Sequence, residues 1–311
     1  MELKKLTGLD PKEYEHPYDK KALDALHSTK GLDTLVKKFY EYGIEKIFRI
    51  QITGSNLKVS EENIPDIYRL FQEAHSVLNF PMVPELYLYH TDELQGFTTG
   101  VDQPIIALSN GCIDSFSEEE LMFIIGREIG HIKSQHVLYY EIGTLLPLLS
   151  EILGSFTLGI GSIISLGLQM ALLQWQRMSE YTADRAGLLA CQDLKVAASA
   201  LSKISGLPNK YYKTFNTDDF IAQARQFEGI DVGNYNKVIR YVSLMLGDHK
   251  WTVDRTNELL KWIDSGQYDA VLNRKTTIKT ETPKFKFCDN CGARILSPTA
   301  SFCPQCGKRV D

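Results

Sequence analysis

The sequence predicts a mainly helical α+β fold that contains one small sheet and is followed by a separate C-terminal unit. Most of the 311 residues lie in segments whose apolar side chains recur at helical spacing. Two short runs, ELYLYH (85–90) and PIIALS (104–109), instead have the composition of strands. Two Cys-x-x-Cys pairs stand near the C-terminus. The hydrophobic fraction of 43 % and the charged fraction of 23 % are those of a globular protein.

Residues 1–80 are expected to form an N-terminal helical region. The segments YDKKALDALHS (18–28), LDTLVKKFYEYGIEKIF (32–48) and NIPDIYRLFQEAHSVL (63–78) all carry apolar residues at helical spacing. Pro65 stands near the start of the last segment. Proline has no backbone N–H, and in the first turn of a helix that group has no partner within the helix.

The main domain is expected to cover residues 81–272, and its strongest signal is a helix that begins after Ser117. Ser117 followed by Glu120 forms a capping box, and acidic residues in the first turn suit the positive end of the helix dipole. The apolar run LMFII then leads into GREIGH (126–131). This motif is therefore placed in the middle of a helix.

Residues 142–176 form a long apolar stretch whose single charge is Glu151. The part at 152–175 exceeds the roughly 20 residues that span a bilayer, although four glycines and two glutamines interrupt it. Two interpretations stay open. These residues form helices that are buried in the core or cover a cleft, or they form a membrane span or an interfacial hairpin.

Residues 284–311 are expected to form a zinc ribbon, joined to the main domain by a polar linker at 273–283. The cysteines of FCDNCG and FCPQCG are Cys288, Cys291, Cys303 and Cys306. Each pair makes a tight turn that aims two thiolates at one point, and two pairs complete a tetrahedral four-sulfur site. This zinc is structural because thiolates fill every position, and it supplies the folding energy of so small a unit. We also expect the ribbon to dock a protein partner.

The net charge and the positions of the cysteines indicate the class of partner and the cellular location. The formal charge of −5 and the lack of a basic stripe argue against a nucleic-acid partner. The first residues contain no apolar run typical of a signal peptide, so Cys112 and Cys191 are expected to be buried thiols. We therefore expect a cytoplasmic protein, with membrane association through residues 152–175 as the open alternative. The sequence does not indicate an oligomeric state.

The segment GREIGH differs by one residue from the zinc-binding motif HExxH. In that motif two histidines at i and i+4 bind zinc, and the glutamate between them is the general base. Here Glu128 and His131 occupy the second and last positions, and Arg127 occupies the first. A third ligand has to come from another helix. The segment RMSEYTADRAG offers Glu180, with Asp184 one turn later on the same face.

Residues 80–265 resemble the zinc metallopeptidases that include the CAAX prenyl proteases and heat-shock protease X. Three motifs carry this resemblance in the family's order: FIIGREIGHIKSQHVLY (family HELGHI..GH), SEYTADRAGLLAC (E..AD..G) and DHKWTVDR (HP....R). GFTTG (96–100) resembles the family's substrate-edge segment, although Gln95 replaces the usual asparagine and Lys250 replaces the proline of the third motif. The resemblance implies a helical metallopeptidase domain with a small sheet, a zinc cofactor, and peptide or protein substrates.

The resemblance also implies roles for single residues. His131 matches the second zinc-binding histidine, Glu180 the glutamate ligand and Glu128 the general base. His249 matches a histidine that donates to the oxyanion of the transition state, and Arg255 matches the arginine that follows it.

Arg127 stands where the family has its first zinc ligand, and this departure leads to our first hypothesis. Arginine is always protonated and offers no lone pair, so it cannot bind zinc. Its guanidinium can instead form an ion pair with Glu180 or with Asp184, which matches the family's second-layer carboxylate. We therefore predict that an internal ion pair replaces the catalytic zinc. The chain would then be a pseudopeptidase that binds peptides by strand addition along GFTTG.

The second hypothesis is an active zinc endopeptidase. Glu128 would then be the general base and His131 and Glu180 the ligands, while His249 would replace the missing ligand if its loop moved inward. The retention of these groups favours this alternative. In either case His136, five residues after His131, is expected to point away from the ligand face. Tyr140 is expected to serve packing.

Overall fold

The computed structural model describes residues 3–144, 166–227, 251–274, 286–291, 294–295, 302–303 and 305–310. The fold is mainly helical with a small mixed sheet, as the sequence predicts. Its helices are η1 (Pro11–Glu13), α1 (Pro17–His27), α2 (Leu32–Glu41), α3 (Ile44–Ser55), α4 (Pro65–Leu78), α5 (Asn110–Ser115), α6 (Glu118–Lys133), α8 (Leu166–Cys191), α9 (Leu194–Ile204), η3 (Asn209–Tyr211), α10 (Thr217–Gln226), α12 (Thr252–Asp264) and α13 (Gln267–Leu272). Its strands are β1 (Leu57–Lys58), β2 (Glu85–Tyr89), β3 (Gly96–Thr99), β4 (Ile105–Ser109), β5 (Lys286–Phe287) and β6 (Arg294–Ile295).

The larger sheet has the strand order β1-β2-β4-β3. β2 and β4 are parallel, and the two outer strands pair antiparallel to them. The register sets Tyr87 opposite Ala107 and Thr98 opposite Ile106. β4 is buried along its whole length. β3 lies at an edge, so one of its sides keeps backbone N–H and C=O groups that no strand of this sheet pairs.

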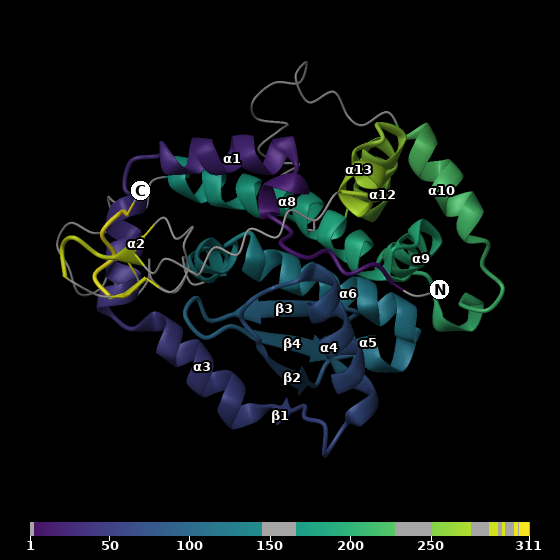
Figure 1. The fold of residues 1–311 in the computed structure, drawn as a ribbon, viewed down its shortest axis with the longest axis horizontal. Coiled ribbons are helices and arrows are strands. Elements are labelled where there is room, and N and C mark those ends of the chain that lie inside the picture. The colour runs from purple at the N-terminus through teal and green to yellow at the C-terminus, as the bar shows by residue number, and fades with distance from the viewer. Residues whose placement is uncertain are drawn as a thin grey trace.

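The elements stack from the sheet through α6 and α8 to α1, and α4 also packs on α6 (Figure 1). At one end of this stack α9, α10, α12 and α13 gather, and α2 lies at the other. One large core cluster joins the sheet to α4, α6, α8 and α9. Tyr14, from the N-terminal segment, is completely buried in it. The proposed boundary at residue 80 stays a prediction.

Glycines bring the backbones of α6 and α8 together. A Cβ atom on Gly126 would lie 2.3 Å from the Cβ of Ala190, and one on Gly130 would lie 2.5 Å from the Cβ of Ala186. On α8, a Cβ on Gly187 would lie 2.7 Å from the Cγ of Arg127. These glycines therefore set the helix spacing, and they place the polar residues of GREIGH against those of α8.

Within the described residues, the predicted helices occur, and the segments ELYLYH and PIIALS contain β2 and β4, with three differences. The GFTTG segment forms β3, which is not among the predicted strands. The segment 32–48 is divided into α2 and α3 at Gly43, whose φ of +61° is incompatible with a continuous right-handed helix. The sequence pattern also misses β1, which has two exposed residues and is too short to show alternation. The capping box of Ser117 and Glu120 begins α6 as expected.

The C-terminal cysteine unit packs against the helices at the α2 end. Phe302 is buried in a cluster with Leu26, Leu35 and Tyr139. Gly307 has a φ of +65°, and a Cβ atom there would lie 2.6 Å from the Cα of Lys37. The unit therefore lies in van der Waals contact with the main body.

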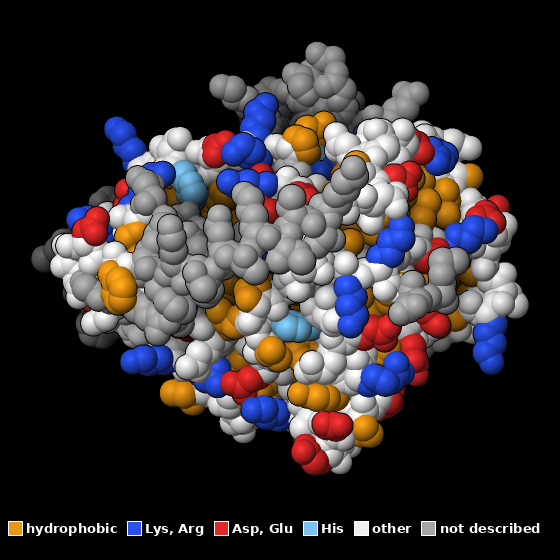
Figure 2. Space-filling view, viewed as in Figure 1, with side chains coloured by type: hydrophobic (Ala, Val, Ile, Leu, Met, Phe, Trp, Pro, Cys, Tyr) orange, Lys and Arg blue, Asp and Glu red, His pale blue; other side chains and the backbone are white. Residues whose placement is uncertain are grey.

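The visible surface mixes charges of both signs. In Figure 2, basic and acidic side chains are interspersed and form no continuous basic patch on this face. No helix within the described ranges is both long and apolar enough to cross a membrane. Of the apolar stretch 152–175, the part up to residue 165 lies outside the described residues, and the rest begins α8.

The close contact between α6 and α8 predicts opposite effects for two glycine substitutions. Gly126→Ala should lower the free energy of unfolding by about 1–3 kcal/mol, because overpacking outweighs the gain in helix propensity. Gly54→Ala in α3 is the matched control. A Cβ atom there meets nothing within 4 Å, so the substitution should stabilise the protein by about 0.5–1 kcal/mol. Urea denaturation measures both. Equal stability of the two variants would contradict the proposed helix spacing.

Candidate functional site

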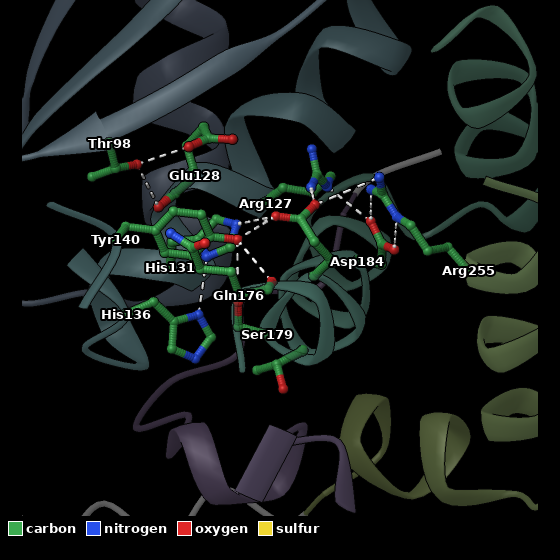
Figure 3. A network of polar contacts seen from close by, with 12 residues as sticks. Thr98, Arg127, Glu128, His131, His136, Tyr140, Gln176, Ser179, Asp184 and Arg255 are labelled. Atoms are coloured by element: carbon green, nitrogen blue, oxygen red, sulfur yellow. Dashed lines mark hydrogen bonds and ion pairs between the residues drawn. The ribbon is translucent and has the colours of Figure 1, made fainter. Parts of the chain in front are cut away.

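Three helices bring four charged side chains together in the interior. Arg127 comes from α6, Glu180 and Asp184 from α8, and Arg255 from α12 (Figure 3). The Arg127 Nε donates to Asp184 Oδ1 at 2.8 Å, and its Nη2 donates to Glu180 Oε2. Arg127 thus contacts both carboxylates, whereas the sequence predicts an ion pair with Glu180 or with Asp184.

Arg255 completes the cluster from the opposite side of Asp184. Its Nε donates to Asp184 Oδ2 at 2.7 Å and its Nη2 to Asp184 Oδ1 at 2.6 Å. Its Nη1 lies 3.5 Å from Glu180 Oε2. Two guanidinium groups therefore face two carboxylates. The Asp184 side chain is only 1 % exposed, so this charge balance is what makes its burial tolerable.

The electrostatic interactions in this cluster favour the charged forms of Glu180 and Arg127. Burial acts to raise the pKa of Glu180, but Arg127, His131 and Arg255 together outweigh burial and hold that pKa well below its ordinary value. Burial acts to lower the pKa of Arg127, but Glu180 and Asp184 outweigh it and raise that pKa. Each partner therefore keeps the other ionised in a dry environment.

Tyr140 holds the second oxygen of Glu180. Its hydroxyl donates to Glu180 Oε1 at 2.6 Å. Tyr140 lies in a helical segment at 137–144 that packs on α8 next to Trp175. From the sequence, Tyr140 is expected to serve packing. Its hydrogen bond to Glu180 is missed because the two residues lie on separate helical segments, and no sequence pattern predicts which of their side chains meet.

His136 faces His131, so the expectation that it points away is wrong. α6 ends at Lys133, and Gln135 adopts a φ of +61°, which turns the chain back toward the helix. The Nδ1 atoms of His131 and His136 then lie 2.9 Å apart, so one ring donates to the other. His136 Nε2 lies 3.1 Å from Asp19 Oδ2 on α1. Helical periodicity gave the wrong direction because the helix stops between the two histidines.

Glu128 lies on the side of α6 that faces the edge strand. The Thr98 hydroxyl on β3 donates to Glu128 Oε2 at 2.8 Å. A Cβ atom on Gly96 would lie 3.2 Å from the Cγ of Glu128, so glycine lets this side chain approach the strand without a shift. The GFTTG segment and Glu128 therefore form one wall.

A cavity of about 500 Å³ opens between this wall and the charge cluster. It is lined by β3 residues together with Arg127, Glu128, His131 and Glu180. Its size is that of a ligand-binding cleft in ordinary proteins. His249, the expected oxyanion donor or substitute ligand, lies outside the described residues.

The described residues of the cleft do not offer a zinc site. Glu180 is held by Arg127 and Tyr140, and His131 Nε2 lies 3.5 Å from Glu180 Oε1. Within the described ranges, the only group of three or more candidate ligands that converges on one point is the C-terminal cysteine cluster. The cationic Arg127 contacts Glu180, and its charge repels a metal cation at that carboxylate.

The C-terminal cysteines do fit a tetrahedral metal. The Sγ atoms of the four cysteines all lie within 4.8 Å of one another. Those of Cys288 and Cys306 are 3.6 Å apart, and those of Cys291 and Cys303 are 3.5 Å apart. Zinc–sulfur bonds of about 2.3 Å in a tetrahedron require edges of about 3.8 Å. A disulfide requires about 2.05 Å, so this spacing is that of a metal site.

Glu141 secures the end of β3 from the helical segment at 137–144. Its Oε1 accepts hydrogen bonds from the Thr99 hydroxyl at 2.5 Å and from the Gly100 backbone N–H at 2.7 Å. Burial raises the pKa of Glu141 from 4.5 to about 7, and Glu45 adds to the increase. The edge strand that lines the cleft is thus held by a carboxyl group that resists ionisation.

A helix bearing the core of a zinc motif, a facing helix with Glu180 and Asp184, and an edge strand across the cleft define a metallopeptidase scaffold. The profile of Peptidase family M48 matches residues 61–263, and the chain belongs to this family. The membership expected from the sequence motifs is thereby confirmed.

The chain is similar to several curated proteins. It is 29 % identical to plastoglobule-localized metallopeptidase 48, chloroplastic, of Arabidopsis thaliana, over 87 % of this chain and 79 % of that protein. It is 25 % identical to protease HtpX homologs of Burkholderia thailandensis and Ralstonia pickettii, over 68 % of this chain and 79 % of each. No solved structure matches the chain at a significant level.

The raised pKa of Glu141 predicts how Glu141→Gln changes the dependence of stability on pH. In the unfolded chain this carboxyl ionises near pH 4.5, whereas in the folded protein it ionises near pH 7. This carboxyl therefore lowers the free energy of unfolding progressively as the pH rises from 4.5 to 7, and its full effect is reached above pH 7. Glu141→Gln should add about 1–3 kcal/mol to the free energy of unfolding at pH 8, and close to nothing at pH 4.5.

Urea denaturation at the two pH values measures this difference. Glu61→Gln, at an exposed position, is the matched control and should show no such dependence. A Glu141→Gln effect of the same size at both pH values would show that the wild-type carboxyl does not resist ionisation.

Proposed function

We propose that this chain is a pseudopeptidase, which binds segments of protein partners in the M48 cleft without zinc-dependent hydrolysis. One observation carries the proposal: the Arg127 guanidinium bonds to both Glu180 and Asp184, where the family's motif has a zinc-binding histidine. The cation neutralises the carboxylates that would otherwise attract a metal. Without a metal, Glu128 has no bound water to activate.

The binding mode we propose is strand addition. β3 is an edge strand, and Glu141 and Thr98 fix its two sides against the helices. An extended peptide can pair with its free edge and lay alternate side chains into the cavity. The relatives are named as peptidases, which supports protein segments as the occupants.

The C-terminal unit has a different proposed role. We infer that residues 284–311 form a zinc ribbon held by a structural zinc, joined through the linker at 273–283 to the metallopeptidase-like domain at 81–272. The spacing of the four sulfur atoms supports this. The ribbon is then the only part of this chain that holds zinc.

Zinc content distinguishes this proposal from an active zinc peptidase. Elemental analysis of the purified full chain should give one zinc per chain. The double variant Cys303→Ser/Cys306→Ser should give none, because two thiolates do not hold a structural zinc. One zinc remaining in the double variant would mean that the cleft binds metal despite Arg127, and the pseudopeptidase proposal would fail.

Restoring the missing ligand gives a second test. Arg127→His completes a set of two histidines and Glu180, so zinc should rise from one to two per chain. Casein cleavage should appear in this variant and disappear when Glu128→Gln is added. Arg225→His, which changes an exposed arginine paired with Asp264, is the matched control and should leave zinc at one per chain. Casein cleavage by the unmodified chain that Glu128→Gln removes would contradict the proposal.

A further inference from the structure

A second cavity, of about 530 Å³, lies behind the cleft. Its wall is mostly apolar and includes Leu23, Phe80, Met82, Val101, Leu138 and Phe302. These residues come from α1, the segment after α4, the end of β3, the helical segment at 137–144 and the cysteine unit. The cavity shares only Val137 with the cleft, so it is a separate site. Its volume lies within the range of cavities that hold small organic ligands.

One wall of this cavity carries a buried cation. Lys133 is only 9 % exposed, and its Nζ donates to the carbonyl oxygens of Leu78 at 2.7 Å and Asn79 at 3.3 Å. Within the described part of the chain, no carboxylate forms an ion pair with it. The equally buried Lys203, by contrast, pairs with Glu120 at 2.6 Å. An ammonium group has three N–H donors, so Lys133 keeps one beyond its two carbonyl partners.

We propose that this cavity binds an amphiphile that has a hydrocarbon chain and a carboxylate head. The chain would lie along the apolar wall, where its burial removes hydrocarbon surface from water. The head would accept the remaining N–H of Lys133 and form a direct ion pair with it. Asp10, which also lines the cavity, and Glu13 act on the charge of Lys133 without a direct ion pair among the described contacts. An uncharged head forms no ion pair with Lys133, and a cationic head is repelled.

The experiment is isothermal titration calorimetry of the full chain at pH 7 with dodecanoate, dodecanol and dodecylamine, each below its micelle concentration. Dodecanoate should bind most tightly and dodecylamine most weakly. Lys133→Met should weaken dodecanoate binding about tenfold to a hundredfold, as expected for a lost charge-assisted hydrogen bond, and leave dodecanol binding unchanged. Lys210→Met, at an exposed position, is its matched control.

A second pair of variants tests the cavity without touching the cation. Val101→Trp should fill the cavity and weaken both dodecanoate and dodecanol, whereas Val83→Trp, which is 57 % exposed and does not line the cavity, should weaken neither. The proposal is overturned if dodecylamine binds as tightly as dodecanoate, or if Val101→Trp leaves both affinities unchanged. Equal losses of acid and alcohol in Lys133→Met would also overturn it.

Discussion

The structure depends on neutralising two carboxylates that α8 carries into the interior. An unpaired buried carboxylate costs several kcal/mol, so Glu180 and Asp184 require cations from elsewhere in the fold. α6 supplies Arg127 and α12 supplies Arg255, and the hydrogen bonds that result tie three helices together. Gly126, on α6, allows this because it lets the helices approach closely enough for the side chains to meet.

Much of the fold can be predicted from local sequence signals, and so can the identity of the charged residues in the cleft. The capping box of α6 and the strand-like composition of β2 and β4 are local, so a short window contains them. The contacts of His131, by contrast, cannot be predicted from local sequence signals. His136 reaches it only because Gln135 reverses the chain, and Asp19 reaches His136 from α1, far away in sequence. No periodicity relates these positions, so packing alone reveals them.

Under the proposed function, the C-terminal cysteine cluster holds a metal and the cleft does not. In the C-terminal unit, four thiols converge at distances that suit a tetrahedral ion. In the cleft, a side-chain cation is bonded where the motif of its family has a metal ligand. A guanidinium can replace the charge of a metal and the bonds that hold a scaffold together. It cannot polarise water, so the proposed function separates the architecture of this fold from its chemistry.

The wide sequence separation of the buried partners bears on how the chain is made. Arg127 and Asp184 are 57 residues apart, Asp184 and Arg255 are 71 apart, and Thr182 bonds Asp19 across 163 residues. During synthesis, α1 leaves the ribosome long before α8, whose Thr182 donates a hydrogen bond to Asp19 of α1. The nascent chain must therefore wait, incompletely packed, until α12 has been synthesised. Contacts so distant in sequence favour slow folding, and a chain that is not yet fully packed exposes apolar surface.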